Sequence, residues 1–333
     1  MRYFTLCLCL TGLSLLLTPL GSSGQKDTHS WDCASDLMLE RAQQNPDWLK
    51  KYRESEQGVY DFFASKTKPL AGKRMMAVTL PVVVHIVHNN GLENISDALV
   101  LTGIQQLNEA FANMAYYDQG TGTNTMIQFC LARRTPDDQL TTGITRDQIS
   151  LTEVTLESED LALKDINRWT PTDYINIWLV REICSAGSGC GVAGYAFFPA
   201  SHGNPEDGIV MEAEYMGSSP GGSGVLAHEM GHYLGLFHTF QGGCFNDDCL
   251  TTGDRVCDTP PDQSTLWTAC DAVVNTCNTD AQSGFSSDQS DMILNFMDYT
   301  DFDCFNDFTP GQGDRMHWFI ENVRSSLLDS KGC

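Results

Sequence analysis

The chain has 333 residues, which is enough for one large domain with a leader or for two domains at most. A hydrophobic content of 41% supports an ordinary buried core. The net charge of -23, from 43 acidic and 20 basic residues, argues against nucleic acid or an anionic membrane as a binding partner.

The N-terminus has the parts of a secretory signal peptide. Arg2 precedes an apolar run from Tyr3 to Leu17, and small residues follow as far as Gly24. The apolar run is short for a bilayer span, and no later segment comes close to the required length. We therefore expect residues 1–24 to be removed and the protein to be secreted to the extracellular space.

The cysteines fit the same oxidising compartment, where disulfides form and persist. The chain has 13 of them, and Cys7 and Cys9 leave with the signal peptide. An odd number remains, so one thiol stays unpaired or bonds to another chain. Cys33 is the outlier, because it stands almost a hundred residues before the next cysteine, Cys130.

Residues 25–74 are polar and helix-prone, and we expect them to form a propeptide. Charged and helix-forming residues fill 36–41 and 48–57. A basic linker punctuated by Gly and Pro follows and ends at Lys73-Arg74, the expected processing site. The alternative is an ordinary N-terminal subdomain on a flexible tether.

The next part of the chain alternates strand and helix patterns. The run 77–88 is rich in β-branched residues, as buried strands are, and 97–117 has apolar residues at helical spacing. Further strands are expected at 125–132 and 174–181, with a helix at 159–169 between them. This order indicates right-handed crossovers and a mixed sheet.

Two short strands, at 194–198 and 208–212, come before the most informative stretch of the chain. We expect one of them at the edge of the sheet, where an extended peptide can add as a further strand. Ahead of them, Cys184 and Cys190 flank a Gly/Ser loop and can pair across it. Asn94 begins the one glycosylation sequon that we recognise and is the expected acceptor.

The stretch from His228 to His238 reads H-E-x-x-H-x-x-G-x-x-H, the signature of metzincin metallopeptidases. On a helix, His228 and His232 lie one turn apart and can bind one zinc ion, with Glu229 toward the open side of the metal. Six more helical residues would turn His238 away from that ion. The helix must therefore end in between, and Gly235 stands where a left-handed stop is needed.

The expected chemistry is zinc-dependent hydrolysis of internal peptide bonds. Three neutral histidines leave one coordination position for water, whose pKa zinc lowers to near 7. Glu229 is expected to act as general base and to pass the proton to the leaving amine. Met297 is expected to form an apolar floor under the metal. Tyr299 either stabilises the developing oxyanion or is a packed turn tyrosine.

We expect Cys33 to act as a latch that binds the zinc ion in the zymogen. A thiolate is a good zinc ligand, so a free cysteine in a propeptide can occupy the water position and silence the enzyme until cleavage removes it. In the competing interpretation Cys33 forms a disulfide with another cysteine, for example Cys333, and a different thiol is left over.

After His238 the chain is acidic, rich in cysteine and weakly periodic. We expect disulfides, and calcium bound by some of the carboxylates, to hold it instead of a core. Oxygen ligands are concentrated between Gly253 and Pro260, at a spacing that differs from that of an EF-hand. A final helix is expected at 315–328, with one apolar face.

With these features in place, the chain resembles the pappalysin family of metzincins. The resemblance implies an α+β catalytic domain at 75–333, with a twisted mixed five-stranded sheet and an active-site helix. It also implies an irregular C-terminal subdomain stabilised by disulfides and calcium. Beyond the zinc motif, the similarity rests on 81–87, 238–244, 258–260, 308–312, the Met297 turn and the segment that begins at Cys33.

The same resemblance implies further site residues and a substrate class. Known members include secreted endopeptidases, some of which prefer a basic residue just after the cut bond. Phe302 stands where several relatives have an aspartate, so basic specificity is not carried over. Ala34 departs from the glycine that usually follows the latch cysteine. The implied calcium ligands are Asp254, Asp258 and Thr259, and the implied disulfides are Cys244–Cys277 and Cys270–Cys304.

Two other classes of protein compete with the protease interpretation. Loss of the general base would favour a non-catalytic zinc-binding module, but Glu229 is present. A calcium-dependent scaffold is supported only by acidity and cysteines. We expect a monomer that binds protein or peptide substrates as an extended strand and binds neither nucleic acid nor a membrane.

Overall fold

The computed structural model describes residues 32–65, 76–187, 189–263 and 268–333. All of these belong to one unit, Trp31–Cys333. The expected signal peptide at 1–24 and the expected processing site Lys73-Arg74 lie outside the described residues. Among the described residues, no helix has the length and apolar character that crossing a bilayer requires.

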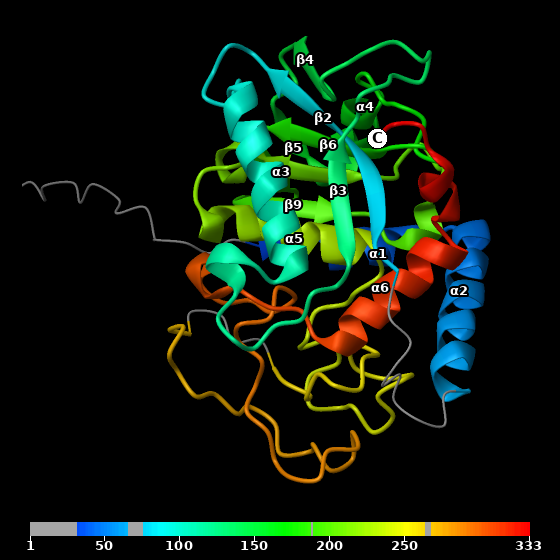
Figure 1. Cartoon of the computed structure of the whole chain (residues 1–333), viewed down its shortest axis with the longest axis vertical. Helices are drawn as coiled ribbons and strands as arrows, with labels where there is room; N and C mark the ends of the chain where they lie inside the picture. The colour runs from blue at the N-terminus through cyan, green and yellow to red at the C-terminus, as the bar shows by residue number, and fades with distance from the viewer. Residues whose placement is uncertain (1–31, 66–75, 188, 264–267) are drawn as a thin grey trace, which may run out of the picture. The chain divides into compact units, whose positions relative to one another are not determined.

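A mixed sheet forms the centre of the unit (Figure 1). Neighbouring strands run parallel, except that β9 and β10 are antiparallel. The strand order is β1-β9-β10-β6-β2-β3, and β4 pairs with the same edge of β2 beyond the end of β3. The strands are β1 (Asp32–Cys33), β2 (Val78–His88), β3 (Ile127–Leu131), β4 (Ile144–Gln148), β6 (Ile175–Val180), β9 (Val192–Ala196) and β10 (Ile209–Glu212).

The mixed sheet is confirmed, with seven strands where five were expected. One of the two additional strands is β4, which pairs with the same edge of β2 as β3 does. The other is β1, which comes from the N-terminal segment and joins β9 at the opposite edge. The central strand β2 is buried over nearly its whole length, which accounts for its run of β-branched residues.

Helices cover both faces of the sheet. The active-site helix α5 (Pro220–Tyr233) and α3 (Asp97–Ala112) pack on one face, against alternate residues of β2 and β6 such as Val84 and Ile177. Residues pointing the other way, including Trp178, pack with α4 (Leu156–Lys164). Because side chains alternate along a strand, one sheet supports two separate apolar layers.

A second, smaller sheet lies beside the first. It consists of β5 (Glu153–Thr155), β7 (Glu182–Ser185) and β8 (Gly189–Cys190). Cys184 and Cys190 are opposite each other in the β7–β8 pair and form a disulfide.

The region after α5 has little regular structure, as its weak periodicity predicted (Figure 1, yellow to orange). Disulfides Cys244–Cys277, Cys249–Cys257 and Cys270–Cys304 tie it together. The helix that follows, α6 (Pro310–Asn322), begins before the expected Arg315 and ends before 328. Thr309 and Gln312 form a capping box there, and Pro310 occupies the first turn, so the helix starts where its free N–H groups are satisfied.

The N-terminal segment is folded onto this unit. Helices α1 (Ser35–Ala42) and α2 (Pro46–Ala64) follow β1 directly. Asn45 caps α2 by accepting from the N–H groups of Asp47 and Trp48. The two helices thus belong to the same compact unit as the rest of the described chain.

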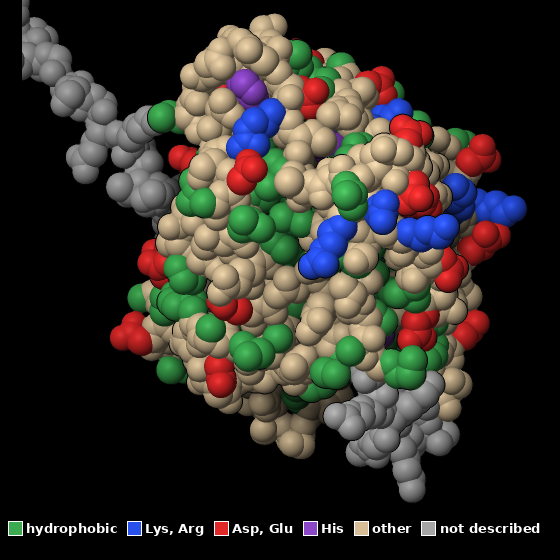
Figure 2. All heavy atoms as spheres, turned by 45° about the horizontal axis from the view of Figure 1, so that its top comes forward, with side chains coloured by type: hydrophobic (Ala, Val, Ile, Leu, Met, Phe, Trp, Pro, Cys, Tyr) green, Lys and Arg blue, Asp and Glu red, His purple; other side chains and the backbone are tan. Residues whose placement is uncertain are grey.

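The surface mixes charges of both signs. On the face shown in Figure 2, acidic and basic side chains are interspersed, with small groups of apolar side chains between them. The net charge of -23 is thus not gathered into one acidic patch on that face.

A buried ion pair joins the end of the chain to the sheet. Arg324 and Asp207 are both almost fully buried and form two hydrogen bonds, of 2.7 and 3.0 Å. Arg324 also lies over the ring of Tyr233 and donates to its carbonyl oxygen. This arginine therefore connects α5, the loop before β10 and the C-terminal segment.

We predict that Asp207→Asn lowers the free energy of unfolding by roughly 3–5 kcal/mol at pH 7, because it leaves Arg324 buried without a counter-ion. Burial opposes ionisation of Asp207, but Arg324 outweighs it and holds the pKa below the ordinary 3.8. The stabilisation is thus present above about pH 4 and is lost as the pH falls through the lower folded pKa. Urea unfolding at pH 7 and pH 3 measures this, and the difference between variant and parent should shrink at pH 3.

The matched control is Asp165→Asn, which breaks an exposed ion pair with Arg168. We expect it to cost less than about 1 kcal/mol at either pH. Equal effects of the two substitutions would contradict the role given to Asp207.

Candidate metal centre and active site

The sequence around α5 explains how three histidines meet. The helix begins at Pro220 with Ser219 as its cap and ends at Tyr233. Gly235 then adopts φ of +99°, and the N–H of Leu236 bonds back to the carbonyl of Gly231. This is the left-handed stop that the spacing predicted, and it returns the chain so that His238 faces the helix.

The three imidazole rings converge through their Nε2 atoms. His228 and His232 are 3.1 Å apart at Nε2, His232 and His238 are 3.1 Å apart, and His228 and His238 are 3.3 Å apart. All three residues are fully buried. Tetrahedral ligands at the usual zinc–nitrogen distance of about 2.0–2.1 Å lie about 3.3–3.4 Å apart, so the spacing fits a zinc ion.

The other ring nitrogens each have an acceptor. Nδ1 contacts the carbonyl oxygen of Phe296 in His228 (2.6 Å), that of Leu236 in His232 (2.8 Å) and Oδ2 of Asp36 in His238 (3.0 Å). Such contacts place the protons on Nδ1 and turn the Nε2 lone pairs to the centre. Burial and the neighbouring rings lower the pKa of His228 well below its ordinary range and that of His232 to about 3.

Cys33 lies with these histidines as a fourth potential ligand. Its sulfur and the three histidine nitrogens all lie within 4.8 Å of one another. Burial and the nearby Glu229 raise the pKa of the thiol well above its ordinary value. A bound divalent cation would reverse this balance, because a coordinating thiol is deprotonated. Three imidazole nitrogens and one sulfur held this close together are therefore the donor set of a metal site.

Glu229 is fully buried beside this cluster. Its Oε2 accepts a hydrogen bond from the Ser35 hydroxyl (3.0 Å) and lies 3.7 Å from the sulfur of Cys33. Burial raises the pKa of Glu229 to about 8, with the charge of Asp36 contributing. The carboxyl group is thus held in a setting where it can both take and give a proton near neutral pH.

The N-terminal segment lies as a strand beside the histidines and Glu229, and the space that it occupies along β9 is the cleft. β1 pairs parallel with β9, the edge strand of the rest of the sheet. The Tyr299 hydroxyl donates to the carbonyl oxygen of Cys33 and accepts from its N–H, both at 3.1 Å. Ser35 is also held here, since its hydroxyl accepts from the N–H of Ala196 (2.9 Å).

Met297 packs against α5, the helix that carries two of the three histidines. It is fully buried, and its sulfur packs against Gly231 of α5. Asn295 and Gln312 exchange two side-chain hydrogen bonds of 2.8 Å, which fix this turn to the start of α6. A larger residue at Gly231 would collide with Met297, which accounts for a glycine inside α5.

The residues expected to bind calcium are only partly brought together. Asp254 is buried and accepts from Thr259 and from the N–H of Val256. Asp258 instead accepts from Thr309 and Gly311 at the start of α6. Burial raises the pKa of Asp254 to about 7.

The cysteine pairings answer the question left open for Cys33. Cys333 pairs with Cys130, and Cys33 is a free, buried thiol. The expected pairs Cys184–Cys190, Cys244–Cys277 and Cys270–Cys304 are present, the alternative pair Cys33–Cys333 is not, and neither Cys130–Cys333 nor Cys249–Cys257 was foreseen. Asn94 is exposed in the loop after β2.

Sequence reasoning missed Ser35, Asp36 and Gly194. Gly194 of β9 lies so close to Glu229 that an added Cβ would be 3.0 Å from its Cγ. The contacts of Ser35 and Asp36 join residues about 200 positions apart, and no local pattern signals them. The only available hint was their position directly after Cys33.

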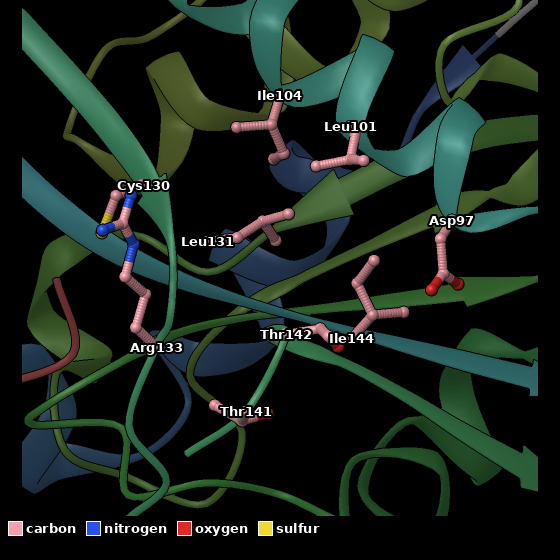
Figure 3. A pocket seen from close by; sticks show the side chains of 9 residues that line it. All are labelled: Asp97, Leu101, Ile104, Cys130, Leu131, Arg133, Thr141, Thr142 and Ile144. Carbon is pink, nitrogen blue, oxygen red and sulfur yellow. The ribbon is translucent and has the colours of Figure 1, made fainter.

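A separate hollow of about 480 Å³ lies beside β3 and α3. Apolar side chains of Leu101, Ile104 and Ile144 line it (Figure 3). Asp97 at its rim is ion-paired with Arg146. None of the predicted catalytic residues lines this hollow.

Comparison with known proteins agrees with this site. The family model Peptidase_M43, described as pregnancy-associated plasma protein-A, matches residues 158–321. An extracellular metalloprotease of Pyricularia oryzae is 30% identical over 265 residues, which cover 76% of this chain and 78% of that protein. One from Verticillium alfalfae is 38% identical over 145 residues, but only 45% of its length is covered.

Solved structures extend the comparison to the N-terminal segment. Tannerella forsythia mature mirolysin in complex with a cleaved peptide is 30% identical, with a TM-score of 0.62, and covers 77% of this chain and 97% of that one. A promirolysin variant from the same organism is 27% identical, with a TM-score of 0.68, and covers 90% and 97%. The chain belongs to the pappalysin family of metzincin metallopeptidases.

Proposed function

We propose that this protein is a secreted zinc endopeptidase made as a zymogen. The observation that carries the proposal is the convergence of three buried histidine Nε2 atoms beside Glu229, with Cys33 as fourth donor. Neutral imidazole and thiolate suit zinc better than they suit hard cations. When bound, zinc polarises the substrate carbonyl and acidifies a water molecule.

Two side chains, Glu229 and Tyr299, would transfer the proton and stabilise the negative charge that develops on the substrate oxygen. Glu229, buried and with a raised pKa, takes the proton of the attacking water and delivers it to the leaving amine. Tyr299 already donates to a backbone carbonyl in the cleft, that of Cys33, and can donate in the same way to the oxyanion of a substrate.

The proposed latency rests on the N-terminal segment. Cys33 provides the zinc latch, and Ser35 holds Glu229 by a hydrogen bond, so both the metal position and the base are engaged. We propose a signal peptide at 1–24, a propeptide at 25–74 cleaved after Lys73-Arg74, and a catalytic domain at 75–333. The larger share of this chain covered by promirolysin than by mature mirolysin supports that division.

Substrates are proposed to be proteins or peptides that bind as an extended strand. The pairing of β1 with β9 shows that this edge accepts an added strand, and a substrate would take the place of β1 once the propeptide is removed. The cleaved peptide bound to mature mirolysin supports this class of substrate. We further propose that the enzyme acts outside the cell as a monomer, carries glycan at Asn94, and needs neither nucleic acid nor a membrane.

Structural calcium is proposed near Asp254 and Thr259. The support is a buried carboxyl group whose pKa is raised by burial, since a cation would keep such a group ionised at neutral pH. Asp258 is a weaker candidate because both of its oxygens already accept hydrogen bonds at the start of α6.

The activity is tested with the secreted full chain after proteolytic processing. We expect cleavage of a denatured protein, and Glu229→Ala should reduce the rate by about 10²–10⁴-fold because proton transfer is lost. Mass spectrometry of the products measures both rate and cleavage sites. The control Glu153→Ala removes an exposed, ion-paired carboxylate and should leave the rate unchanged. A Glu229→Ala enzyme as active as its parent would rule out the mechanism.

Metal removal gives a second prediction. Elemental analysis should find one zinc per chain, and dialysis against a chelator should remove it and lower the melting temperature, because a ligand that binds only the folded state stabilises it. His238→Ala should lose zinc, whereas Glu229→Ala should keep it. Full zinc retention in His238→Ala would remove that residue from the ligand set.

Latency is tested in the unprocessed chain. Cys33→Ala should show peptidase activity before processing, because the fourth metal position is then free for water. The substitution breaks no disulfide, since Cys33 is unpaired. If Cys33→Ala stays inactive until residues 25–74 are removed, the thiol is not required for latency and the contacts of Ser35 and β1 are sufficient.

A further inference from the structure

Helix α2 is bound to the rest of the protein by contacts that take no part in the latch. Glu56 is largely buried and receives Arg315 Nη2 on both carboxylate oxygens, at 2.7 and 2.9 Å. Arg255 Nη1 donates to Oε2 at 2.7 Å. Burial opposes the ionisation of Glu56, but the two guanidinium groups outweigh it and lower its pKa.

The two arginines form a built anion site. Arg315 is 1% exposed, and its Nε donates to the carbonyl of Gly235 (2.8 Å), while its Nη1 is buried without a hydrogen-bond partner. Both guanidinium groups lie over the ring of Phe237, at 5.1 and 5.2 Å. Among the described residues, the only carboxylate ion-paired with either arginine is Glu56.

The apolar surroundings of Trp48 adjoin this anion site and would form a hollow if Trp48 were removed. Trp48 is packed against Phe198, Ala200 and Phe237, and its indole N–H donates to the hydroxyl of Ser201 (2.7 Å). Tyr52 stacks on Trp48 with ring centroids 5.2 Å apart.

The spacing of these residues defines a single helix face. Trp48, Tyr52 and Glu56 recur every four residues, so they point in one direction. Two residues further, Gly58 lies against Trp318 of α6, and an added Cβ would collide with that ring. A glycine within α2 weakens the isolated helix but permits this close approach.

The surface that α2 covers adjoins the histidine cluster. The ring of Phe198 lies 5.5 Å from that of His232, and 5.2 Å from that of Phe237 on its other side. Arg315 binds the carbonyl of Gly235, in the turn between two of the histidines. A polypeptide in the cleft can therefore continue directly onto this surface.

We propose that this surface is an exosite for protein substrates in the processed enzyme. It would take an amphipathic helical segment that presents an aromatic side chain to the hollow and, two turns later, a carboxylate to Arg255 and Arg315. The proposal rests on the proposed function, because it requires the propeptide to leave. Departure of Glu56 leaves two guanidinium groups without a carboxylate, and an acidic side chain of the substrate restores the pairing.

Binding is measured first, with zymogen processed from the full chain. Fluorescently labelled peptides of residues 45–65, with the parent sequence or with Glu56→Gln, are titrated against the enzyme. We expect the parent peptide to bind at least about ten-fold more tightly than the Glu56→Gln peptide, because hydrogen bonds between charged groups are stronger than those to a neutral amide. Gly58→Leu in the peptide should also weaken binding, because of the collision with Trp318.

Enzyme variants assign the effect to the arginines. The preference for Glu56 over Gln should become smaller in Arg255→Gln, because Arg315 alone then remains to bind the carboxylate. It should recover partly in Arg255→Lys and persist in full in Arg146→Gln. Arg146 is a partly exposed, ion-paired arginine on β4 and serves as the matched control. Equal binding of the two peptides to the parent enzyme overturns the proposal, as does mass spectrometry showing that α2 stays bound after processing.

Kinetics then separate the exosite from the protease. Two synthetic substrates share one cleavage sequence, taken from the products of the denatured protein. Each carries a helical extension with Trp, Tyr and either Glu or Gln at the spacing found in α2. We expect a KM about ten-fold lower for the Glu substrate with kcat unchanged. Equal KM values overturn the exosite while cleavage still supports the protease. If neither substrate is cut, the proposed function fails and the peptide titration still decides whether this surface binds a carboxylate.

Discussion

The structure depends on one break in one helix. His228 and His232 face the same point only while α5 continues, and His238 reaches that point only because the helix ends at Tyr233. Gly235 makes the reversal with φ of +99°, a conformation that costs little for glycine alone. The ring of Phe319 lies so close to Gly235 that no side chain fits there. Local backbone chemistry and long-range packing thus demand the same residue.

That turn is also where distant parts of the chain are joined. The carbonyl of Gly235 accepts from Arg315 of α6, and Arg315 in turn binds Glu56 of α2. A short path of contacts thus connects the metal ligands, the C-terminal helix and the N-terminal segment. Removal of α2 would therefore change the surroundings of Arg315, which contacts the turn between two of the histidines.

Glu229 combines full burial with close contacts from the N-terminal segment. Burial makes the charge of Glu229 costly and raises its pKa, which suits proton transfer near neutral pH. The hydroxyl of Ser35 and the sulfur of Cys33 meanwhile occupy the space around it. Tyr299 is similarly engaged by the backbone of Cys33. The N-terminal segment therefore holds the groups that a substrate would meet, using the pairing edge that a substrate would use.

Local sequence determined the metal-binding stretch, the Met297 turn and most helices and strands, because each depends on helical period, strand alternation or the conformational freedom of one glycine. With Cys7 and Cys9 removed in the expected signal peptide, the odd number of cysteines also indicated one thiol that is unpaired or bonded to another chain. Only the tertiary structure decided that Cys33 is that thiol, since Cys130 and Cys333 meet across 203 residues. It likewise placed Ser35 on Glu229, Asp36 on His238 and Glu56 on two arginines. Such contacts join elements far apart in the chain, and their partners are fixed by how the elements pack, which no local pattern records.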